Sequence, residues 1–458
     1  MTSCPWNRIG FNDEIALRHH TRIHHSKDNP RLAPAKARLL SPAASVDLIR
    51  RQDRSNLKDS RLPTFSYKRE KGRRTLAEDY LDRVSPNHVR QGGDWFAFFE
   101  PHQPRVLDIE LVHTLPHERV VFSVSFSSCG LYLATGSYRA VSLYDVATGT
   151  TIQKCTYDDT RPDLQYVRAV RFHPDSTKII SGGEDGAVRV WDFSARQCQK
   201  WKAHELFIRG LDIGNNGNLI ATGSEDRTVR LWTSASEETN MFSDYNTPNK
   251  FRQFDLKVAA MSVSISPDCR VVAAGLVNGV VCVWDIATGS LTARLTHDDT
   301  VYGVAFNPSS SHIISGSRDK TVKYWELDPN MQQKSKMGSF GHSDVQVHEG
   351  HDDFVMETTM TPDAPWLISG SEDKSVRIVD ADTGALQCII VGHTGSVLSV
   401  QCSPTGEYFA TGSHDETVRI WQYVFKPVHP WPVTDGLFIL EDGFCLQIDA
   451  GTNRMSTH

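Results

Sequence analysis

One ten-residue pattern recurs along most of this chain, and it limits the possible folds more than any other feature of the sequence. The run GSEDRTVRLW at residues 223–232 has four close copies and two weaker ones. The seven copies begin at Gly136, Gly182, Gly223, Gly275, Gly316, Gly370 and Gly412. Their last positions lie 41 to 54 residues apart. A repeat of about 40 residues sets the architecture of a whole chain, because each unit buries its apolar face only against its neighbours.

Each unit indicates strands rather than helices. Apolar and polar residues alternate, a Gly/Asp turn interrupts them, and a second alternating run ends in Trp in most copies. This pattern is typical of strands joined by hairpins. A second constant supports the same repeat, because a histidine precedes a turn aspartate by 22 residues at His204, His297, His351 and His393.

These motifs resemble the WD-repeat family, and the resemblance extends from about residue 106 to residue 422. It implies an all-β fold, a seven-bladed WD-repeat β-propeller in which four-stranded units stack radially. Residues 105–113, RVLDIELVH, precede the first repeat. We expect them to supply the outer strand of the last blade, which closes the ring and covers an exposed sheet edge.

The family resemblance also implies a buried hydrogen-bonded chain of Trp, Ser or Thr, His and Asp within a blade. Complete sets are His204, Thr222, Asp226 and Trp232; His297, Ser315, Asp319 and Trp325; and His393, Thr411, Asp415 and Trp421. The same residue types could form a hydrolase triad, but an active site is normally built once, whereas this set recurs in several units. We therefore expect a structural role, in which each hydrogen bond contributes about 1 kcal/mol.

Other motifs of catalysis are missing from the sequence. It contains no phosphate-binding loop, zinc-finger spacing or H-E-x-x-H motif. A His-rich run, RHHTRIHHS at residues 18–26, favours a solvated tail, because no acidic or thiol ligand completes a metal site. No apolar run approaches the ~20 residues that cross a bilayer. We expect no catalytic residues, metal, cofactor, small-molecule substrate or membrane contact.

The segment before the ring narrows the resemblance. Residues 94–101 read DWFAFFEP, and residues 107–117 read LDIELVHTLPH. Fungal Tup-type general transcriptional co-repressors, which share their architecture with Groucho, have a D-W-x-x-x-F-x-P segment followed by an L-D-x-x-L-x-x-x-L-x-H strand in these places. The matching residues are Asp94, Trp95, Phe99, Pro101, Leu107, Asp108, Leu111, Leu115 and His117. This resemblance, over residues 78–422, implies a non-enzymatic co-repressor scaffold in the nucleus.

The resemblance divides the chain into four parts. These are a basic, mostly disordered tail (1–77), a Tup-like neck segment (78–104), the propeller (105–422) and a C-terminal extension of unknown role (423–458). Tup-type co-repressors begin with a helical segment that tetramerises and binds a tetratricopeptide-repeat partner. Residues 1–77 show no heptad pattern and are interrupted by prolines, so the sequence does not support the tetramer or that partner. The chain fits a paralogue or a shortened form of such a protein.

Charge is distributed unevenly along the chain. Residues 1–90 carry 19 basic and 10 acidic residues, whereas the rest carries 30 and 45. The acidic part suits basic partners. The run YKREKGRR at residues 67–74 indicates nuclear import or non-specific contact with phosphate groups, and a solvated linker is the alternative. The candidate import residues are Lys68, Arg69, Lys71, Arg73 and Arg74.

Ligands of such propellers usually dock on the face that carries the turn before each aspartate and the start of each first strand. The residues expected to bind a partner protein there are Tyr166, Glu184, Tyr302, Phe122, Arg168, Phe207, Arg209, Glu225, Phe354 and Glu372. Aromatic side chains with three glutamates suit a peptide that has an apolar anchor and basic flanks.

The resemblance implies DNA-bound transcriptional repressors as partners of this face, with histones and histone deacetylases as further partners. A substrate receptor or adaptor of a ubiquitin ligase complex is the alternative function. It would need an F-box-like helical module upstream of the ring, and residues 1–77 contain no good candidate for one.

Overall fold

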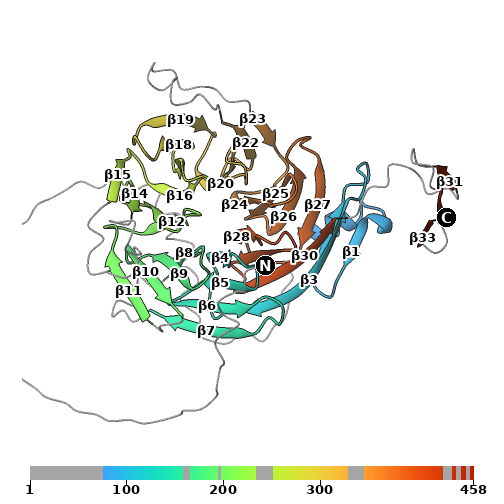
Figure 1. Cartoon of the computed structure of the whole chain (residues 1–458), viewed down its shortest axis with the longest axis horizontal. Coiled ribbons are helices and arrows are strands. Elements are labelled where there is room, and N and C mark those ends of the chain that lie inside the picture. The colour runs from blue at the N-terminus through green and yellow to red at the C-terminus, as the bar shows by residue number, and fades with distance from the viewer. Residues whose placement is uncertain are drawn as a thin grey trace, which may run out of the picture. The chain divides into compact units, whose positions relative to one another are not determined.

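The computed structural model describes residues 76–157, 166–193, 197–233, 251–327 and 345–425, together with three short strands near the C-terminus. Between residues 76 and 425, seven antiparallel sheets are arranged around a common axis (Figure 1). The expected all-β, seven-bladed propeller is therefore confirmed. Residues 1–75 of the expected disordered tail (1–77), which include the import residues at 68–74, lie outside the described residues.

Blades 1 to 5 each contain four consecutive strands, and the first strand of each blade lies nearest to the central axis (Figure 1). Blade 1 contains β4 (Ser123–Phe126), β5 (Tyr132–Gly136), β6 (Ala140–Asp145) and β7 (Thr151–Thr156). Blade 2 contains β8 (Val167–Phe172), β9 (Lys178–Gly183), β10 (Ala187–Asp192) and β11 (Gln197–Lys202). Blade 3 contains β12 (Ile208–Ile213), β13 (Leu219–Ser224), β14 (Thr228–Thr233) and β15 (Phe251–Asp255). Blade 4 contains β16 (Ala260–Ile265), β17 (Val271–Leu276), β18 (Val280–Asp285) and β19 (Leu291–Thr296), and blade 5 contains β20 (Val301–Phe306), β21 (His312–Ser317), β22 (Val322–Glu326) and β23 (Val345–His348).

Blades 6 and 7 take up strands from before the first repeat. Blade 6 contains β24 (Val355–Met360), β25 (Trp366–Ser371), β26 (Ser375–Asp380) and β27 (Leu386–Val391). Blade 7 contains β28 (Val397–Cys402), β29 (Tyr408–Ser413), β30 (Thr417–Phe425) and β3 (Leu107–Pro116). Because β3 pairs antiparallel with β30, the expected closure of the ring by the segment before the first repeat is confirmed.

The neck joins these two blades from outside. It contains α2 (Leu76–Leu81), the short 3₁₀ helix η2 (Pro86–His88), β1 (Val89–Gln91) and β2 (Phe96–Phe99). Strand β2 pairs with β27 and extends blade 6. In blade 7, Arg419 forms an ion pair with Asp94 of the neck (2.5 Å), and the Trp95 ring packs edge-on against Trp421 (5.5 Å between centroids). The neck therefore spans the junction between the last two blades.

The glycine that begins each repeat allows neighbouring blades to approach closely. A Cβ atom on Gly223 would lie 2.7 Å from a methyl carbon of Val263 in the next blade. The same approach, 2.6 Å, is found between Gly316 and Val355. Real Cβ atoms do not come this near to a methyl group, so the repeat requires glycine for packing between sheets.

Hydrogen bonds also join the innermost strands of neighbouring blades. The hydroxyl of Ser123 accepts a bond from the Val170 backbone N–H (3.1 Å), and Ser399 accepts one from Val124 across the closure (3.1 Å). Asp212 accepts a bond from the Ile265 N–H (2.8 Å). These bonds satisfy backbone donors that the blades' own sheets do not reach.

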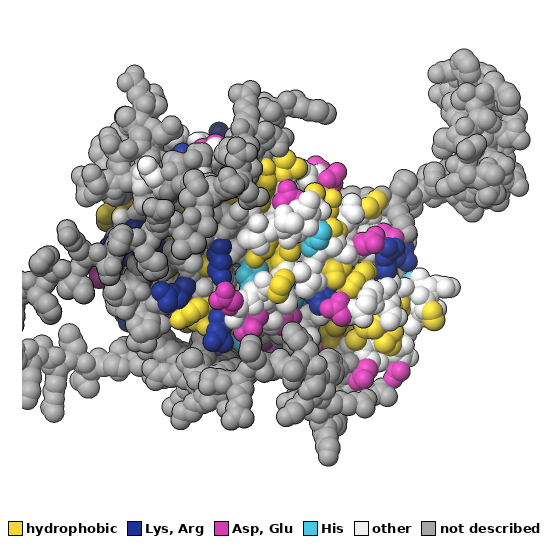
Figure 2. Space-filling model, turned by 90° about the horizontal axis from the view of Figure 1, so that it is seen from below, with side chains coloured by type: hydrophobic (Ala, Val, Ile, Leu, Met, Phe, Trp, Pro, Cys, Tyr) yellow, Lys and Arg dark blue, Asp and Glu magenta, His cyan; other side chains and the backbone are white. Residues whose placement is uncertain are grey.

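Three further strands, β31 (Gly436–Ile439), β32 (Cys445–Asp449) and β33 (Arg454–Thr457), form a small antiparallel sheet. On the side of the molecule drawn in Figure 2, acidic, basic and hydrophobic side chains of the described residues are interspersed rather than segregated. No helix among the described residues is long and apolar enough to span a membrane.

Candidate functional site

The first candidate chemistry is the repeated set of Trp, Ser or Thr, His and Asp. In blade 5, His297 Nδ1–H donates to Asp319 Oδ2 (2.8 Å), and the Ser315 hydroxyl donates to His297 Nε2 (2.7 Å). The same hydroxyl oxygen accepts the indole N–H of Trp325 (2.8 Å). The sets in blades 3 and 7 have the same bonds, between 2.7 and 3.0 Å, among His204, Thr222, Asp226 and Trp232 and among His393, Thr411, Asp415 and Trp421.

Protonation in these sets is fixed by burial and hydrogen bonding. Burial lowers the pKa of His297, so its imidazole is neutral near pH 7. Burial opposes ionisation of Asp319, but the hydrogen bond from Thr321 and the nearby His297 outweigh it and lower the pKa of Asp319 to about 2. The hydroxyl proton and one oxygen lone pair of Ser315 are both engaged inside the blade. The set is arranged to hold strands together rather than to attack a substrate.

Two other blades contain variants of the set. In blade 6, His351 binds Asp373 (2.8 Å) and Ser369 (2.8 Å), while Val379 stands where most blades have Trp. In blade 1, His117 contacts the hydroxyl groups of Thr135 (2.9 Å) and Tyr144 (3.3 Å). His351 keeps the 22-residue spacing to its aspartate, whereas the same offset from His117 leads to Arg139.

Blade 2 contains a variant that the sequence did not reveal. Tyr157 occupies the place of the histidine, and its hydroxyl contacts Ser181 (2.8 Å), which also accepts the indole N–H of Trp191 (2.8 Å). Asp185 pairs instead with Arg189 (2.6 Å), whose guanidinium lies over the Tyr157 ring (3.7 Å). Tyr157 precedes Ser181 by 24 residues, whereas His297 precedes Ser315 by 18, so the inserted residues hid the equivalence.

The second candidate site lies on one end of the ring. We call this end the turn face; it carries the turns before the aspartates, including residues 184, 225, 318 and 372, and the starts of the innermost strands. In six blades the innermost strand has a β-bulge just after its first residue. A bulge turns a side chain away from the regular alternation. The six bulged residues all line the central cavity, and they are Arg168, Arg209, Met261, Tyr302, Met356 and Leu398.

Glu184 and Glu225 do not present free carboxylates on the turn face. Arg168 Nε donates to Glu184 (2.9 Å), and the two side chains are only 8% and 6% exposed. Arg209 Nε donates to Glu225 (2.8 Å), with exposures of 12% and 14%. The three glutamates were expected to suit the basic flanks of a peptide, and at these two positions a bulged arginine of the same blade already neutralises the carboxylate.

Aromatic residues predicted for the site form two groups at the mouth of the cavity. Phe122 and Tyr166 pack edge-on (5.3 Å between centroids), with Tyr138 beside Tyr166 (5.2 Å) and the Arg168 guanidinium over Phe122 (3.8 Å). A second group joins Tyr302 to Phe354 (6.4 Å), from blades 5 and 6. The fifth predicted aromatic residue, Phe207, lies beside Arg209, whose guanidinium is 5.6 Å from the ring centroid.

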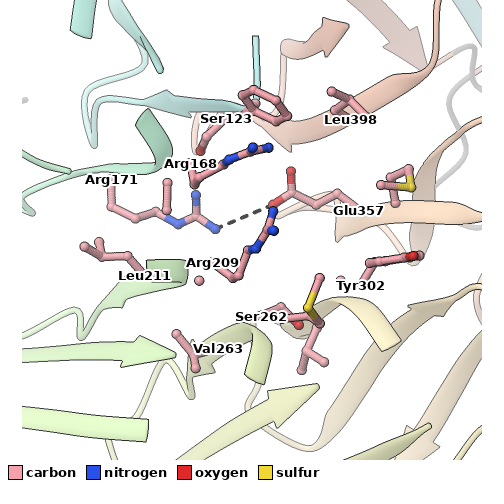
Figure 3. Close-up of a pocket in the computed structure, with 17 residues that line it drawn as sticks. Ser123, Arg168, Arg171, Arg209, Leu211, Ser262, Val263, Tyr302, Glu357 and Leu398 are labelled. Atoms are coloured by element: carbon pink, nitrogen blue, oxygen red, sulfur yellow. Dashed lines mark ion pairs between the residues drawn. The ribbon is translucent and has the colours of Figure 1, made fainter. Parts of the chain in front are cut away.

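The cavity itself is crossed by an ion pair that the sequence did not indicate. Arg171 reaches from blade 2 to Glu357 of blade 6 (3.6 Å) and also to Asp212 (3.3 Å), as Figure 3 shows for the Glu357 pair. Burial raises the pKa of Glu357, although Arg171 and the Val400 backbone N–H (3.0 Å) oppose this. The sequence contained one sign of this ion pair: a charged residue inside an innermost strand, where most blades have small or apolar residues.

No group of His, Cys, Asp and Glu among the described residues could hold a metal ion. The turn face presents aromatic rings, flexible apolar side chains and paired charges around a cavity. Such surfaces recognise other proteins through a few desolvated anchors.

Comparisons with known proteins agree with this geometry. The family model described as "WD domain, G-beta repeat" matches residues 109–145, 155–192, 195–233, 255–285, 289–326, 342–380 and 384–422. The chain is 42% identical to "Transcriptional repressor rco-1" of Neurospora crassa over 331 residues. These residues cover 70% of this chain and 52% of that protein. It is 36% identical to "General transcriptional corepressor tupA" of Dictyostelium discoideum over 123 residues, 27% of this chain and 21% of that protein.

A more distant relative is "Protein groucho" of Drosophila melanogaster, 23% identical over 271 residues, which are 59% of this chain and 29% of that protein. The chain thus spans about half the length of the first of these relatives and less of the other two. The expected resemblance to Tup-type co-repressors is confirmed by these matches. Because the family model matches more than half of the residues and the structure has the corresponding seven blades, this chain belongs to the WD-repeat family.

Proposed function

We propose that this chain is a non-enzymatic transcriptional co-repressor scaffold whose turn face binds short motifs of DNA-bound repressors. The observation that carries the proposal is the pair of aromatic groups, Phe122 with Tyr166 and Tyr302 with Phe354, at the mouth of the central cavity. These four side chains are neither fully buried nor fully exposed. They therefore have apolar surface left to desolvate when a partner binds. The names of the relatives, which include a repressor and a co-repressor, support the biological setting.

The lining of the cavity suits an apolar anchor of a peptide. Met261, Met356 and Leu398 line it from blades 4, 6 and 7, together with Tyr302 of blade 5. Figure 3 labels Leu398 and Tyr302 among the lining residues. Methionine side chains are flexible and polarisable, so they fit apolar groups of different shape. A short motif with one bulky apolar residue would bury that residue here and lay its neighbours across the aromatic groups.

We place this function in the nucleus, with residues Lys68, Arg69, Lys71, Arg73 and Arg74 as the import signal. Histones and histone deacetylases are the further partners that this proposal includes. A fluorescent reporter fused to residues 60–80 should accumulate in the nucleus. Uniform distribution of that reporter would remove the import role from this segment.

The co-repressor role is tested by tethering the full chain to DNA through a heterologous DNA-binding domain. Transcription of a reporter with the matching sites should fall, because tethering replaces recruitment by a repressor. Unchanged transcription with a well-expressed fusion would contradict the co-repressor role.

The turn face is tested by Tyr302→Ala. The matched control is Tyr408→Ala, at the start of β29 and at the end of blade 7 opposite the turn face. Recruitment of the untethered chain by a repressor should be lost only with Tyr302→Ala, whereas tethered repression should survive both changes. Equal recruitment of the two variants would move the repressor site away from the turn face.

A further inference from the structure

A glutamate occupies the same position of the turn face in blades 2, 3 and 6. In each blade its backbone N–H donates, over 2.8 to 3.2 Å, to the carbonyl oxygen of the aromatic residue that precedes the innermost strand. The glutamates and their aromatic partners are Glu184 with Tyr166, Glu225 with Phe207, and Glu372 with Phe354. This shared bond makes the three positions equivalent in structure as well as in sequence.

The three positions differ in one residue. In blades 2 and 3 the bulged residue of the innermost strand is an arginine, Arg168 or Arg209, and its guanidinium binds the glutamate. In blade 6 the bulged residue is Met356, which has no charge to offer. Glu372 therefore has the aromatic neighbour and the backbone geometry of its counterparts but lacks their arginine.

The surroundings of Glu372 do not replace that cation. Among the described residues, no basic side chain lies within ion-pair distance of its carboxylate. The nearby Arg318 is shared with Asp299 (3.5 Å) and rests over the Phe354 ring (4.8 Å). Burial and then Asp353 raise the pKa of Glu372, against the smaller effects of His414 and Arg318. Two carboxylates and a half-buried setting thus favour an added positive charge.

We propose that Glu372, Met356 and Phe354 receive an arginine side chain of the bound partner, in the place that Arg168 and Arg209 fill in their own blades. The inference deepens the proposed function, because it takes the turn face as the peptide site and assigns one residue of the peptide. A guanidinium binds a carboxylate with two parallel hydrogen bonds and lies flat on aromatic or thioether groups. Lysine offers only a point charge, whereas the guanidinium groups of Arg168 and Arg209 lie 5.4 and 5.6 Å from the ring centroids of Tyr166 and Phe207, the counterparts of Phe354.

The position of Met356 links this arginine site to the apolar anchor. Met356 lines the central cavity, whereas Glu372 lies in the turn beside it. A partner that inserts an apolar side chain into the cavity would therefore place a neighbouring arginine on Glu372. The site would bind a partner that has an arginine close to an apolar residue, which is a narrower requirement than a partner that is merely basic.

The test titrates two ligands into the full chain, whose methionine methyl groups are labelled for NMR. One ligand is arginine with both its amino and carboxyl ends blocked as amides, and the other is citrulline blocked in the same way. Citrulline has the same shape without the charge. Broadening of the ligand's own NMR lines reports binding in every variant, and the methyl signals of Met356 and Met261 report where it occurs. We expect a saturable shift at Met356 but not at Met261 with arginine, and binding at least about tenfold weaker with citrulline or after Glu372→Gln.

A second variant fills the site from within. Met356→Arg should abolish arginine binding, because the new guanidinium takes Glu372 as in blades 2 and 3. Met261→Arg is the matched control: it introduces the same side chain at the same bulge of blade 4, where Val277 stands in place of the glutamate. Arginine binding should survive it.

Equal responses to arginine and citrulline, or equal loss in Met261→Arg and Met356→Arg, would overturn the arginine site. Loss of the arginine response with intact tethered repression and Tyr302-dependent recruitment would leave the co-repressor role standing without this site. An arginine response in a chain that does not repress when tethered would retain the site and refute that role.

Discussion

The hydroxyl of Ser315 holds two buried groups of blade 5, and removing it should destabilise the ring far more than a serine-to-alanine change usually does. Trp325 and His297 are 7% and 6% exposed, and their ring nitrogens lie 2.8 and 2.7 Å from the hydroxyl oxygen. Ser315→Ala leaves the indole donor and the imidazole acceptor without partners. At about 1 to 3 kcal/mol for each orphaned group, the expected loss is about 3 kcal/mol.

Ser262→Ala is the control for this experiment, because the Ser262 hydroxyl is also shielded from solvent but has no hydrogen-bond partner among the described residues. Its removal should change the free energy of unfolding by less than about 0.5 kcal/mol. Thermal unfolding followed by tryptophan fluorescence should place the midpoint of Ser315→Ala about 4 °C below the wild type. If the two variants unfold together, the set does not stabilise its blade as the geometry implies.

Two further predictions concern acid stability and the neck. Burial lowers the pKa of His117 to about 4, below the unfolded value of 6.5, so its contribution to stability is complete above pH 6.5 and is lost progressively as the pH falls from 6.5 to 4. Between pH 7 and pH 5 the chain should lose about 2 kcal/mol through this residue, a loss that denaturant titrations should not find in His117→Asn. Asp94→Ala should leave the buried Arg419 unpaired and speed amide exchange in residues 96–99. The control Glu110→Ala removes a carboxylate that is as exposed as Asp94 (64%), but its partner Arg90 is 37% exposed rather than buried, so that exchange should be unchanged.

The repeats predicted the ring and its inner bonds because both depend on constant spacing. The distances of 18 and 22 residues that join His297 to Ser315 and to Asp319 survive in the blades that lack long insertions. Tyr157 was missed because extra residues shift it out of that spacing. The offset alone therefore identifies a set only where the preceding loop has standard length.

The residues of the turn face could be named from the sequence, but the ion pairs between their side chains could not. Arg168 and Glu184 are 16 residues apart in the sequence, yet nothing in the sequence places a β-bulge at Arg168. The bulge turns this arginine toward the cavity and onto the glutamate. An alternating pattern records which residues face inward along a regular strand, so it cannot report where regularity is broken.

The pairing of β3 with β30 has a consequence for synthesis of the chain on the ribosome. The two strands are separated by about 300 residues, and at 5 to 20 residues per second β30 emerges roughly 15 to 60 s after β3. During that interval β3 has no partner, and its apolar residues Leu107 and Ile109, which are buried in the finished ring, remain in contact with solvent. The first strand of the ring is therefore also the last to find its place, and the nascent chain should depend on chaperones until blade 7 is complete.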